Sequence, residues 1–488
     1  MGVPLDDTWI HFQFADNFSK GFFFQYNPGE LTAGTTSPLY VVILGTFNFF
    51  FGNFMISSLI LSFAFYILSC FAVYKISFFI FSEANSPLIP FSNSYTSEYI
   101  SLIITMLTVF SGRIAWASLS GMETTIFIFF CLAGVYSHIK NLKKGNFTLL
   151  PALMFAFASV SRPEGYLLSL FYFLDFVLNM IYTGEFKKKM LMLISSLILY
   201  SVITVPYLVF SYLVSGDFFP NTFRGQGGFF RFVPEFEFLR IAAIYFFRDN
   251  FITALLYFFS IVYYLANIKK YFSEFRYVNL IFLWIIILPV ALSVLVPNWR
   301  HHVRYLIPLI PYINFASVWV LLILLNSEFL AGLKNIILRR KYLISFIVLF
   351  SFIYYIVFAL ALGKNTDNIN DQQVYLAGWV RDNVKRNETI AVNDIGAITF
   401  ISKNRVIDMA GLITPEVLNY RKYQWKDNLD SLNLLLKNNK VTYLIIYDNW
   451  FKEYLREYGN ELTFITSAVL EDNTICGGIE MKVYKTNF

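Results

Sequence analysis

A series of long apolar runs separated by short polar segments constrains this chain more than any other feature. A helix needs about 20 residues to cross a bilayer at a rise of about 1.5 Å per residue. The runs lie at 37–52, 54–81, 99–111, 124–139, 147–160, 165–183, 190–215, 238–266, 277–297, 303–325 and 342–362. With 57% hydrophobic and 14% charged residues, against about 25% charged in soluble domains, a water-soluble globule is excluded. We therefore predict a mainly α, polytopic membrane protein with about ten to eleven spans.

Four clusters of Lys and Arg predict the orientation, because cytoplasmic loops carry an excess of these residues. They lie at 140–145, 185–189, 269–276 and 334–341. This arrangement places the loops 112–123, 161–164, 216–237 and 298–302 and the chain after residue 363 on the outer side of the membrane. If the short run 99–111 only dips into the membrane, both ends of the chain lie outside.

The N-terminal segment 1–37 is polar and rich in aromatic residues, and no spanning run precedes it. An outer loop needs a preceding helix or signal peptide to reach that side. We therefore expect that the natural gene product begins upstream of Met1 with one more helix. The alternative is that the start is genuine and this segment is cytoplasmic.

Residues 363–488 differ in composition from the rest of the chain. Polar helical stretches alternate with short β-branched runs such as "TIAVND", "RVIDM", "VTYLIIYD" and "GGIEMKVYK", which are typical of strands. This length suits one small domain. We predict a membrane domain over 1–362 and a soluble, extracytoplasmic α/β domain over 363–488.

Several classes of function have no support in the sequence. The three cysteines form no framework, and metal-ligand clusters such as CxxC or HExxH are absent. The P-loop pattern of ATP-driven pumps is also absent. The net charge of +6 is modest, and its positive residues follow membrane topology, so nucleic-acid binding is not expected.

The predicted outer loops hold most of the chemically useful side chains. They read "DDTWIH", "YNPGELTAGTTSPL", "SGMETT", "SRPEG", "SGDFFPNTFRGQ" and "PNWRHHVRY". Loops are polar for trivial reasons, but these loops combine little Lys with paired acids, isolated arginines and Asn–Thr pairs. Such a set favours a site at the membrane interface, reached by lipid from one side and by water from the other.

The segment "DDTWIHFQFADNFSKGFFFQYNPGELTAGTTSPL" resembles the first extracytoplasmic loop of bacterial GT-C glycosyltransferases, above all the terminal arabinofuranosyltransferases of cell-wall arabinan. The family pattern of an Asp pair, a mid-loop Asn, Tyr-Asn-x-Gly-Glu and Thr-Ser-Pro-Leu is complete. "SGMET", "RPEG", "PNTF", "RYLIPLIP" and the stretch 394–416 follow in the family's order. Gln13 departs from the pattern, since relatives often carry an Arg there.

This resemblance implies a multi-pass enzyme of the cytoplasmic (inner) membrane that transfers a sugar from a polyprenyl phosphate to a glycan, lipid or protein acceptor outside the cytoplasm. Glycosyl transfer needs a base for the acceptor hydroxyl, and a carboxylate suits that role. We predict Asp6 or Asp7 as the base, without choosing between them. The alternative for an Asp pair is a helix N-terminus, and both roles are compatible.

The leaving phosphate gains charge, and arginines bind phosphate oxygens with paired hydrogen bonds. Arg162, Arg304 and Arg300 are the predicted phosphate ligands, although each is equally typical of an interface anchor. His11 follows Asp7 by one helical turn. Further predicted substrate ligands are Asn27, Glu30, Glu123, Glu164, Asn221 and His302, and for the two glutamates a structural pairing with Arg162 is an even alternative.

An Asp pair with a Glu offers oxygen ligands for a divalent cation, but the resemblance favours the metal-free group, so we expect neither metal nor cofactor. The competing hypotheses are a transporter or flippase and a non-catalytic envelope-assembly protein. A transporter usually has repeated halves and a midplane site, which this sequence lacks. An assembly protein would tolerate loss of Asp6 and Asp7.

Overall fold

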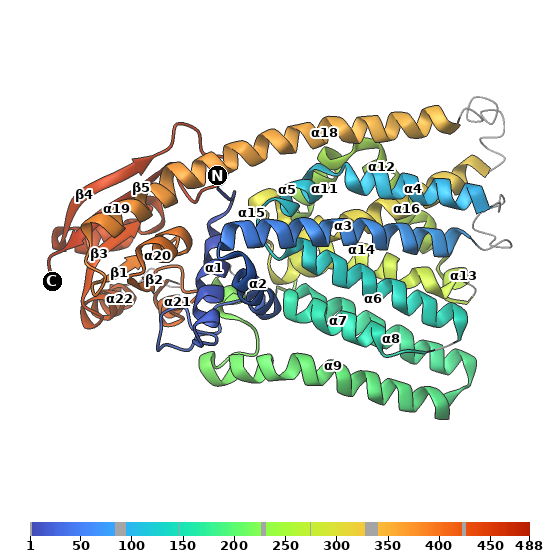
Figure 1. Cartoon of the computed structure of the whole chain (residues 1–488), viewed down its shortest axis with the longest axis horizontal. Coiled ribbons are helices and arrows are strands. Elements are labelled where there is room, and N and C mark those ends of the chain that lie inside the picture. Colours follow the sequence, from blue (N-terminus) through green and yellow to red (C-terminus); the bar gives the residue numbers. More distant parts are fainter. Residues whose placement is uncertain are drawn as a thin grey trace.

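The computed structural model describes residues 2–82, 94–145, 147–225, 231–273, 275–326, 340–421 and 426–488. It is a bundle of long helices joined at one end to a small α/β domain (Figure 1). The bundle helices are α1 (Asp6–Ser19), α2 (Pro38–Phe51), α3 (Phe54–Phe81), α4 (Ser94–Val109), α5 (Gly112–Ser118), α6 (Thr124–Lys144), α7 (Leu150–Ser161), α8 (Glu164–Thr183), α9 (Phe186–Ser215), α10 (Asn221–Gly225), α11 (Phe236–Asp249), α12 (Phe251–Ala266), α13 (Ile268–Ser273), α14 (Asn279–Leu295), α15 (Arg300–Val303), α16 (Ile310–Asn326) and α18 (Arg340–Ile369). The predicted mainly α, polytopic fold is confirmed.

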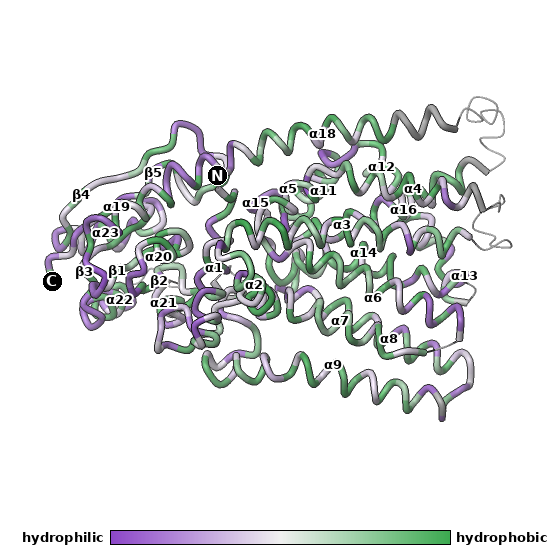
Figure 2. Tube along the Cα trace, viewed as in Figure 1, coloured by the Kyte–Doolittle hydropathy of each residue, from purple (hydrophilic) through white to green (hydrophobic). Residues whose placement is uncertain are grey.

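Seven helical segments of the described residues are long and apolar enough to cross a membrane. They are Phe54–Phe81, Thr124–Lys144, Glu164–Thr183, Lys189–Ser215, Arg276–Leu295, Arg300–Leu324 and Ile347–Asn383. Figure 2 shows these helices as mostly hydrophobic along their length. The chain is therefore a multi-pass membrane protein.

The predicted count of ten to eleven spans stays a prediction, because the remaining apolar helices are short or bent. Helices α2, α7 and α12 have 10–17 residues each. Helices α4 and α5 together are long enough for one span but meet at an angle of 62°. That break falls at the end of the run 99–111, for which sequence analysis leaves open whether it spans the membrane or only dips into it.

The basic clusters gather at one end of the bundle. The end of α6, the α8–α9 connection and α13 lie opposite the α/β domain (Figure 1). Most of the fourth predicted cluster, 334–339, lies outside the described residues. Since cytoplasmic loops carry an excess of Lys and Arg, the described clusters lie on a common side, as the predicted orientation requires.

The α/β domain is built on a five-stranded mixed sheet in the order β2-β1-β3-β5-β4. Its strands are β1 (Thr389–Val392), β2 (Arg405–Asp408), β3 (Val441–Ile446), β4 (Leu462–Val469) and β5 (Glu480–Thr486), and its helices are α19 (Tyr375–Asn383), α20 (Gly396–Ser402), α21 (Glu416–Arg421), α22 (Lys426–Asn438) and α23 (Lys452–Tyr458). The first three strands pair in parallel, and β5 pairs antiparallel with β3 and β4. The edge strand β4 has no counterpart among the predicted strands, because its side chains are largely exposed and do not alternate.

The two parts of the chain are joined by continuous helix rather than by a linker. Helix α18 runs past the predicted boundary at 362–363, and a π-helical turn at Asn370–Val374 carries it into α19. On the other side, Phe400 of α20 packs on Trp9 and Phe12 of α1, with ring centroids 5.6 and 5.7 Å apart. The α/β domain therefore sits directly on the N-terminal segment.

Candidate active site

Helix α1 begins with the two predicted carboxylates. Asp6 and Asp7 occupy its first turn, where the helix dipole favours negative charge. The helix ends at Ser19, and the chain turns at Gly21, whose φ of 87° suits glycine. The helix N-terminus, which sequence analysis gave as the alternative for this Asp pair, is therefore present.

Asp6 binds the N-terminus of α20. Its two carboxylate oxygens accept hydrogen bonds from the backbone amides of Gly396 (2.7 Å) and Ala397 (2.8 Å). Burial and the neighbouring Asp394 raise the pKa of Asp6 to about 8, and the two amide bonds only partly oppose this. Asp6 thus fixes the contact between the two parts of the chain.

This contact makes a prediction about Gly396. A Cβ at this position would lie 2.1 Å from the backbone oxygen of Asp6, so Gly396→Ala forces the two elements apart. Overpacking costs typically about 1–3 kcal/mol, and we expect Gly396→Ala to lower the melting temperature of the purified protein clearly. The control is Gly378→Ala in α19, where nothing lies within 4 Å of the added atom. Equal melting temperatures for both variants would contradict this reading.

Asp7 faces a different group. Its Oδ2 pairs with the Nη2 atom of Arg304 at 2.5 Å, and its side chain is 32% exposed. Although burial alone would raise the pKa of Asp7, the charge of Arg304 lowers it below the usual value. The environments of the two adjacent acids therefore separate their pKa values, and Asp7 is the ionised one near neutral pH.

Arg304 follows a strained turn. His301, His302 and Val303 all have positive φ, at 55°, 60° and 51°. This region costs roughly 1–2 kcal/mol per residue for side chains other than glycine, and a β-branched residue there is a true outlier. Strain of this kind concentrates at functional sites. Here the turn brings His301 and Arg304 to the cavity described next.

A cavity of about 930 Å³ lies where the bundle meets the α/β domain. Its bundle side is formed mainly by Asp6, Asp7, residues 297–301 and Arg304. Its other side is formed by residues of the α/β domain, including Gln373, Asp394 and Trp450. Arg300 also lines the cavity, with its guanidinium 5.2 Å from the Trp450 ring centroid. Its size is at the upper end of typical small-molecule sites, roughly 300–1,000 Å³.

Asp394 is a site residue that the sequence reasoning did not single out. Its carboxylate accepts hydrogen bonds from Gln373 and Tyr447, both at 2.9 Å, and burial raises its pKa. The signal was available, because Asp394 follows β1 within the stretch "DIGAI" that carries part of the resemblance. Gln373 comes from the π-helical turn, a feature that is frequent at functional sites.

Four predicted ligands form a buried network behind the cavity instead of lining it. Arg162 pairs with Glu123 (2.9 Å) and Glu164 (2.8 Å), and His11 bonds Glu123 at 3.1 Å. Burial opposes ionisation, but the hydrogen bond from His11 and the charge of Arg162 lower the pKa of Glu123 to about 2. Both glutamates therefore pair with Arg162, as the alternative to sugar binding predicted. Arg162 itself does not line the large cavity.

The other predicted ligands lie elsewhere. His302 bonds Asn365 at 3.0 Å and packs edge-on against Trp116, away from the cavity. Asn27 bonds both backbone groups of Val406, and Glu30 pairs with Arg405 at 2.6 Å. These two residues and Asn221 line a second, smaller cavity. The substrate roles assigned to them from the sequence stay predictions.

No group of three or more His, Cys, Asp or Glu side chains close enough to hold a metal ion occurs within the described ranges. The expectation that no metal takes part stays a prediction. Asp6 and Asp7 have separate partners here, so they do not converge on one point as a ligand pair would.

Comparison with solved structures confirms the predicted fold of a polytopic helical membrane protein. The chain is similar to ArnT from Cupriavidus metallidurans bound to undecaprenyl phosphate, with a TM-score of 0.58 and 12% identity. The alignment covers 98% of this chain and 93% of ArnT. An identity of 12% shows a shared fold and nothing finer. The more specific likeness to terminal arabinofuranosyltransferases stays a prediction.

A second similar structure is the archaeal oligosaccharyltransferase AglB from Archaeoglobus fulgidus, in complex with an inhibitory peptide and a dolichol-phosphate. Its TM-score is 0.57 at 12% identity, over 96% of this chain and 69% of AglB. A family model described as a domain of unknown function (DUF8728) matches residues 367–484. No curated protein matches the sequence.

Proposed function

We propose that this chain is a glycosyltransferase that moves a sugar from a polyprenyl-phosphate donor to an acceptor held against the α/β domain. The observation that carries the proposal is the unsatisfied guanidinium nitrogen of Arg304 beside the large cavity. Its side chain is buried and lines the large cavity, with Nη2 paired to Asp7 while Nη1 is buried without a hydrogen-bond partner among the described residues. Such an unsatisfied charged donor is costly, and a phosphate oxygen would satisfy it.

The fold supports the same class of donor. ArnT is described with undecaprenyl phosphate and AglB with a dolichol-phosphate, and both share the architecture of this chain. The cavity lies between the bundle and the α/β domain, which joins the bundle at one end (Figure 1). In the proposed arrangement the lipid carrier enters from the membrane and the acceptor from water. We place this end of the bundle outside the cytoplasm, because the basic clusters lie at the opposite end. The inner membrane as the location follows only from the family resemblance.

In the proposed reaction Asp7 takes the proton of the acceptor hydroxyl as its oxygen attacks the anomeric carbon. The bond between that carbon and the phosphate oxygen breaks, and its electron pair leaves with the polyprenyl phosphate. Arg304, with Arg300 at the cavity edge, stabilises the departing charge. A single displacement inverts the anomeric configuration. The sugar and the acceptor, whether glycan, lipid or protein, are left open.

The position of the site favours this reading over a transporter or a non-catalytic assembly protein. Transporters bind their substrates near the bilayer midplane, whereas this cavity lies between the bundle and the α/β domain. An assembly protein has no need of an ionised acid beside an unsatisfied arginine. The transferase hypothesis requires Asp7 and Arg304 for activity, whereas the assembly-protein hypothesis does not.

The test is mass spectrometry of lipids that remain bound to the purified protein. Wild type should retain a polyprenyl phosphate or its sugar-linked form. Arg304→Gln should lower that retention about 10- to 100-fold, because a charge-assisted hydrogen bond contributes roughly 1.5–3 kcal/mol. Arg240→Gln is the matched control, since Arg240 is exposed on α11 and pairs only with Glu237 in the described residues.

Asp7→Asn should keep the donor, because that acid acts after binding. If wild type and Arg304→Gln retain the same amount of polyprenyl phosphate, or if wild type retains only bilayer phospholipids, the proposed function is wrong. Melting temperatures of all variants show whether a loss reflects binding or folding.

A further inference from the structure

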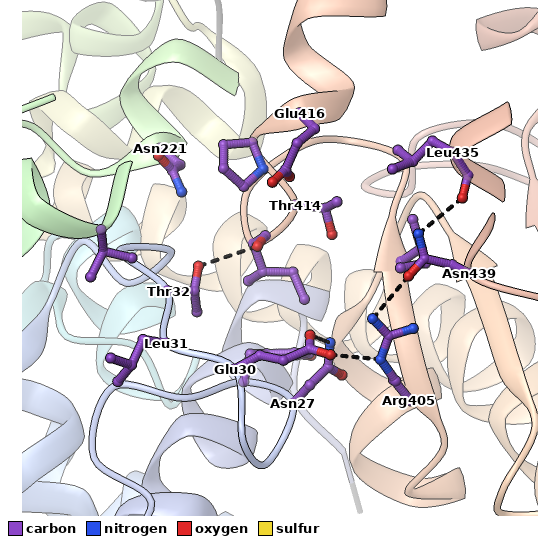
Figure 3. A pocket seen from close by; sticks show the side chains of 15 residues that line it. Asn27, Glu30, Leu31, Thr32, Asn221, Arg405, Thr414, Glu416, Leu435 and Asn439 are labelled. Carbon is purple, nitrogen blue, oxygen red and sulfur yellow. Dashed lines mark hydrogen bonds and ion pairs between the residues drawn. The ribbon is translucent and has the colours of Figure 1, made fainter. Parts of the chain in front are cut away.

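A second cavity, of about 310 Å³, lies between the N-terminal segment and the α/β domain. Figure 3 shows its lining side chains, which come from three parts of the chain. Asn27, Glu30 and Thr32 belong to the N-terminal segment, Asn221 begins α10, and the rest, including Arg405 and Asn439, belong mainly to the α/β domain. The volume suits a small molecule rather than a lipid chain.

Asn221 indicates that this space binds a ligand. Its side chain is 1% exposed, and neither its Oδ1 nor its Nδ2 atom has a hydrogen-bond partner among the described residues. Figure 3 shows the amide pointing into the space between the lining side chains. Its backbone amide bonds Ala33 at 3.1 Å, so its position is fixed. Most buried polar groups are paired, and a ligand with both donors and acceptors would pair this one.

The remaining lining is polar but not basic. Arg405 is the single cation among the described lining residues, and its charge is met by Glu30 at 2.6 Å and its Nη2 by Asn439 at 3.0 Å. Glu416 adds a second carboxylate. This balance disfavours a phosphate or another anion. Amides, hydroxyls and carboxylates together suit the hydroxyl groups of a neutral sugar, each of which donates and accepts.

The second cavity shares two walls with the large one. Helix α10 contributes Asn221 to the second cavity and Gly225 to the first. The loop after β2 does the same, with Leu412 facing the first cavity and Ile413 the second. This loop is held by Asp408, whose carboxylate accepts a hydrogen bond from the backbone amide of Ile413 at 3.0 Å. The two cavities are therefore neighbours, with α10 and this loop between them.

We infer that the second cavity binds a neutral sugar residue of a glycan acceptor, at a distance from the hydroxyl that reacts beside Asp7. The inference rests on the proposed function and narrows its acceptor class to a glycan. It gives a role to Asn27, Glu30 and Asn221, which line the second cavity and not the large one. Asn27 and Glu30 shape the wall, and Asn221 holds the sugar.

Saturation-transfer difference NMR on the detergent-purified full chain tests the inference. The probes are the methyl glycosides of glucose, galactose, mannose and arabinofuranose, with glucose 6-phosphate as an anionic comparison. Wild type should transfer saturation to at least one neutral glycoside and more weakly to glucose 6-phosphate. Asn221→Leu should lower the signal about fivefold or more, the contribution expected of one or two hydrogen bonds.

A second variant avoids the risk that a buried substitution unfolds the chain. Glu416 is exposed at the start of α21, and Glu416→Ala should also weaken the signal. Glu471→Ala, another exposed acid of the same domain that does not line the cavity, should leave it unchanged. The inference is overturned if no methyl glycoside is saturated, if glucose 6-phosphate binds more strongly, or if Asn221→Leu and Glu416→Ala both give the wild-type signal.

The two proposals fail in different ways. If Asp7→Asn abolishes sugar transfer while Asn221→Leu and Glu416→Ala both bind methyl glycosides as wild type does, only the second-cavity inference is wrong. If Asn221→Leu loses glycoside binding but wild type neither retains polyprenyl phosphate nor transfers sugar, the cavity binds sugar and the proposed function is wrong.

Discussion

Replacing Asp7 with asparagine should lower the rate of sugar transfer by about 10²–10⁴-fold, the usual contribution of general acid–base catalysis. Asparagine keeps the size of the side chain but cannot take a proton. The partner Arg304 loses an ion pair, so donor retention should stay equal or rise while turnover falls. Radiolabelled sugar transfer, measured alongside retained lipid, separates these two effects.

The pH dependence of the rate distinguishes the two adjacent acids. The pKa of Asp7 is lowered below its ordinary value by Arg304, so Asp7 is ionised throughout the range above about pH 4. The pKa of Asp6 is raised to about 8 by burial and by Asp394. A base at Asp7 therefore gives no rise in rate between about pH 6 and about pH 8.5, whereas a base at Asp6 gives a rise with its midpoint near pH 8.

Asp16→Asn is the matched control on the same helix. Asp16 pairs with Lys20 and Lys403 and lines neither cavity, so its loss should leave the rate within about twofold, as surface ion pairs contribute little. Asp6→Asn should act mainly through stability, because it removes an acceptor from the N-terminus of α20. Full activity of Asp7→Asn in a well-folded protein would remove Asp7 from the mechanism.

Arg162→Met should destabilise the folded protein by about 3–5 kcal/mol, the usual cost of removing one partner from a buried ion pair. Arg162 is 2% exposed and is the cation that pairs with both Glu123 and Glu164. Without it, two buried carboxylates lose their countercharge and only His11 remains on Glu123 in the described structure. Thermal unfolding in detergent is the measurement, with Arg240→Met as the exposed control.

A second substitution separates lost charge balance from lost packing. Glu164 has no side-chain bond in the described structure other than those from Arg162, so Glu164→Gln added to Arg162→Met should recover part of the stability. If Arg162→Met melts within a degree or two of wild type, the network does not support the fold. If the double variant is less stable than Arg162→Met, the loss is one of packing rather than of charge.

The sequence was most informative where local pattern dictates structure. Long apolar runs predicted the spanning helices, because a segment of that length and hydrophobicity has no other stable environment. A helix N-terminus was the alternative that the sequence offered for Asp6 and Asp7, and both lie in the first turn of α1. The strands β1, β2, β3 and β5 follow β-branched runs at the predicted places, while β4, an exposed edge strand, carries too weak a pattern.

The sequence could not say which of the two acids pairs with an arginine beside the large cavity. Asp6 and Asp7 are neighbours of identical chemistry, and they differ only in what the fold brings to them. Asp6 meets the amide of Gly396, 390 residues away along the chain, and Asp7 meets Arg304. Likewise, nothing local separates Arg162, which is paired in a buried network, from Arg304, which keeps one guanidinium nitrogen unsatisfied among the described residues.

The sequence by itself therefore determined the membrane class, the helical bundle, the α/β domain and the segments that carry polar chemistry. The tertiary structure alone decided which of those polar side chains share a cavity and which neutralise one another. The reason is physical: hydrophobicity and helix propensity act over neighbouring residues, whereas pairing and desolvation of charges depend on residues that meet only after folding. Only the tertiary structure, for example, places Asn27, Glu30 and Asn221 in one cavity and Asp7 in the neighbouring one.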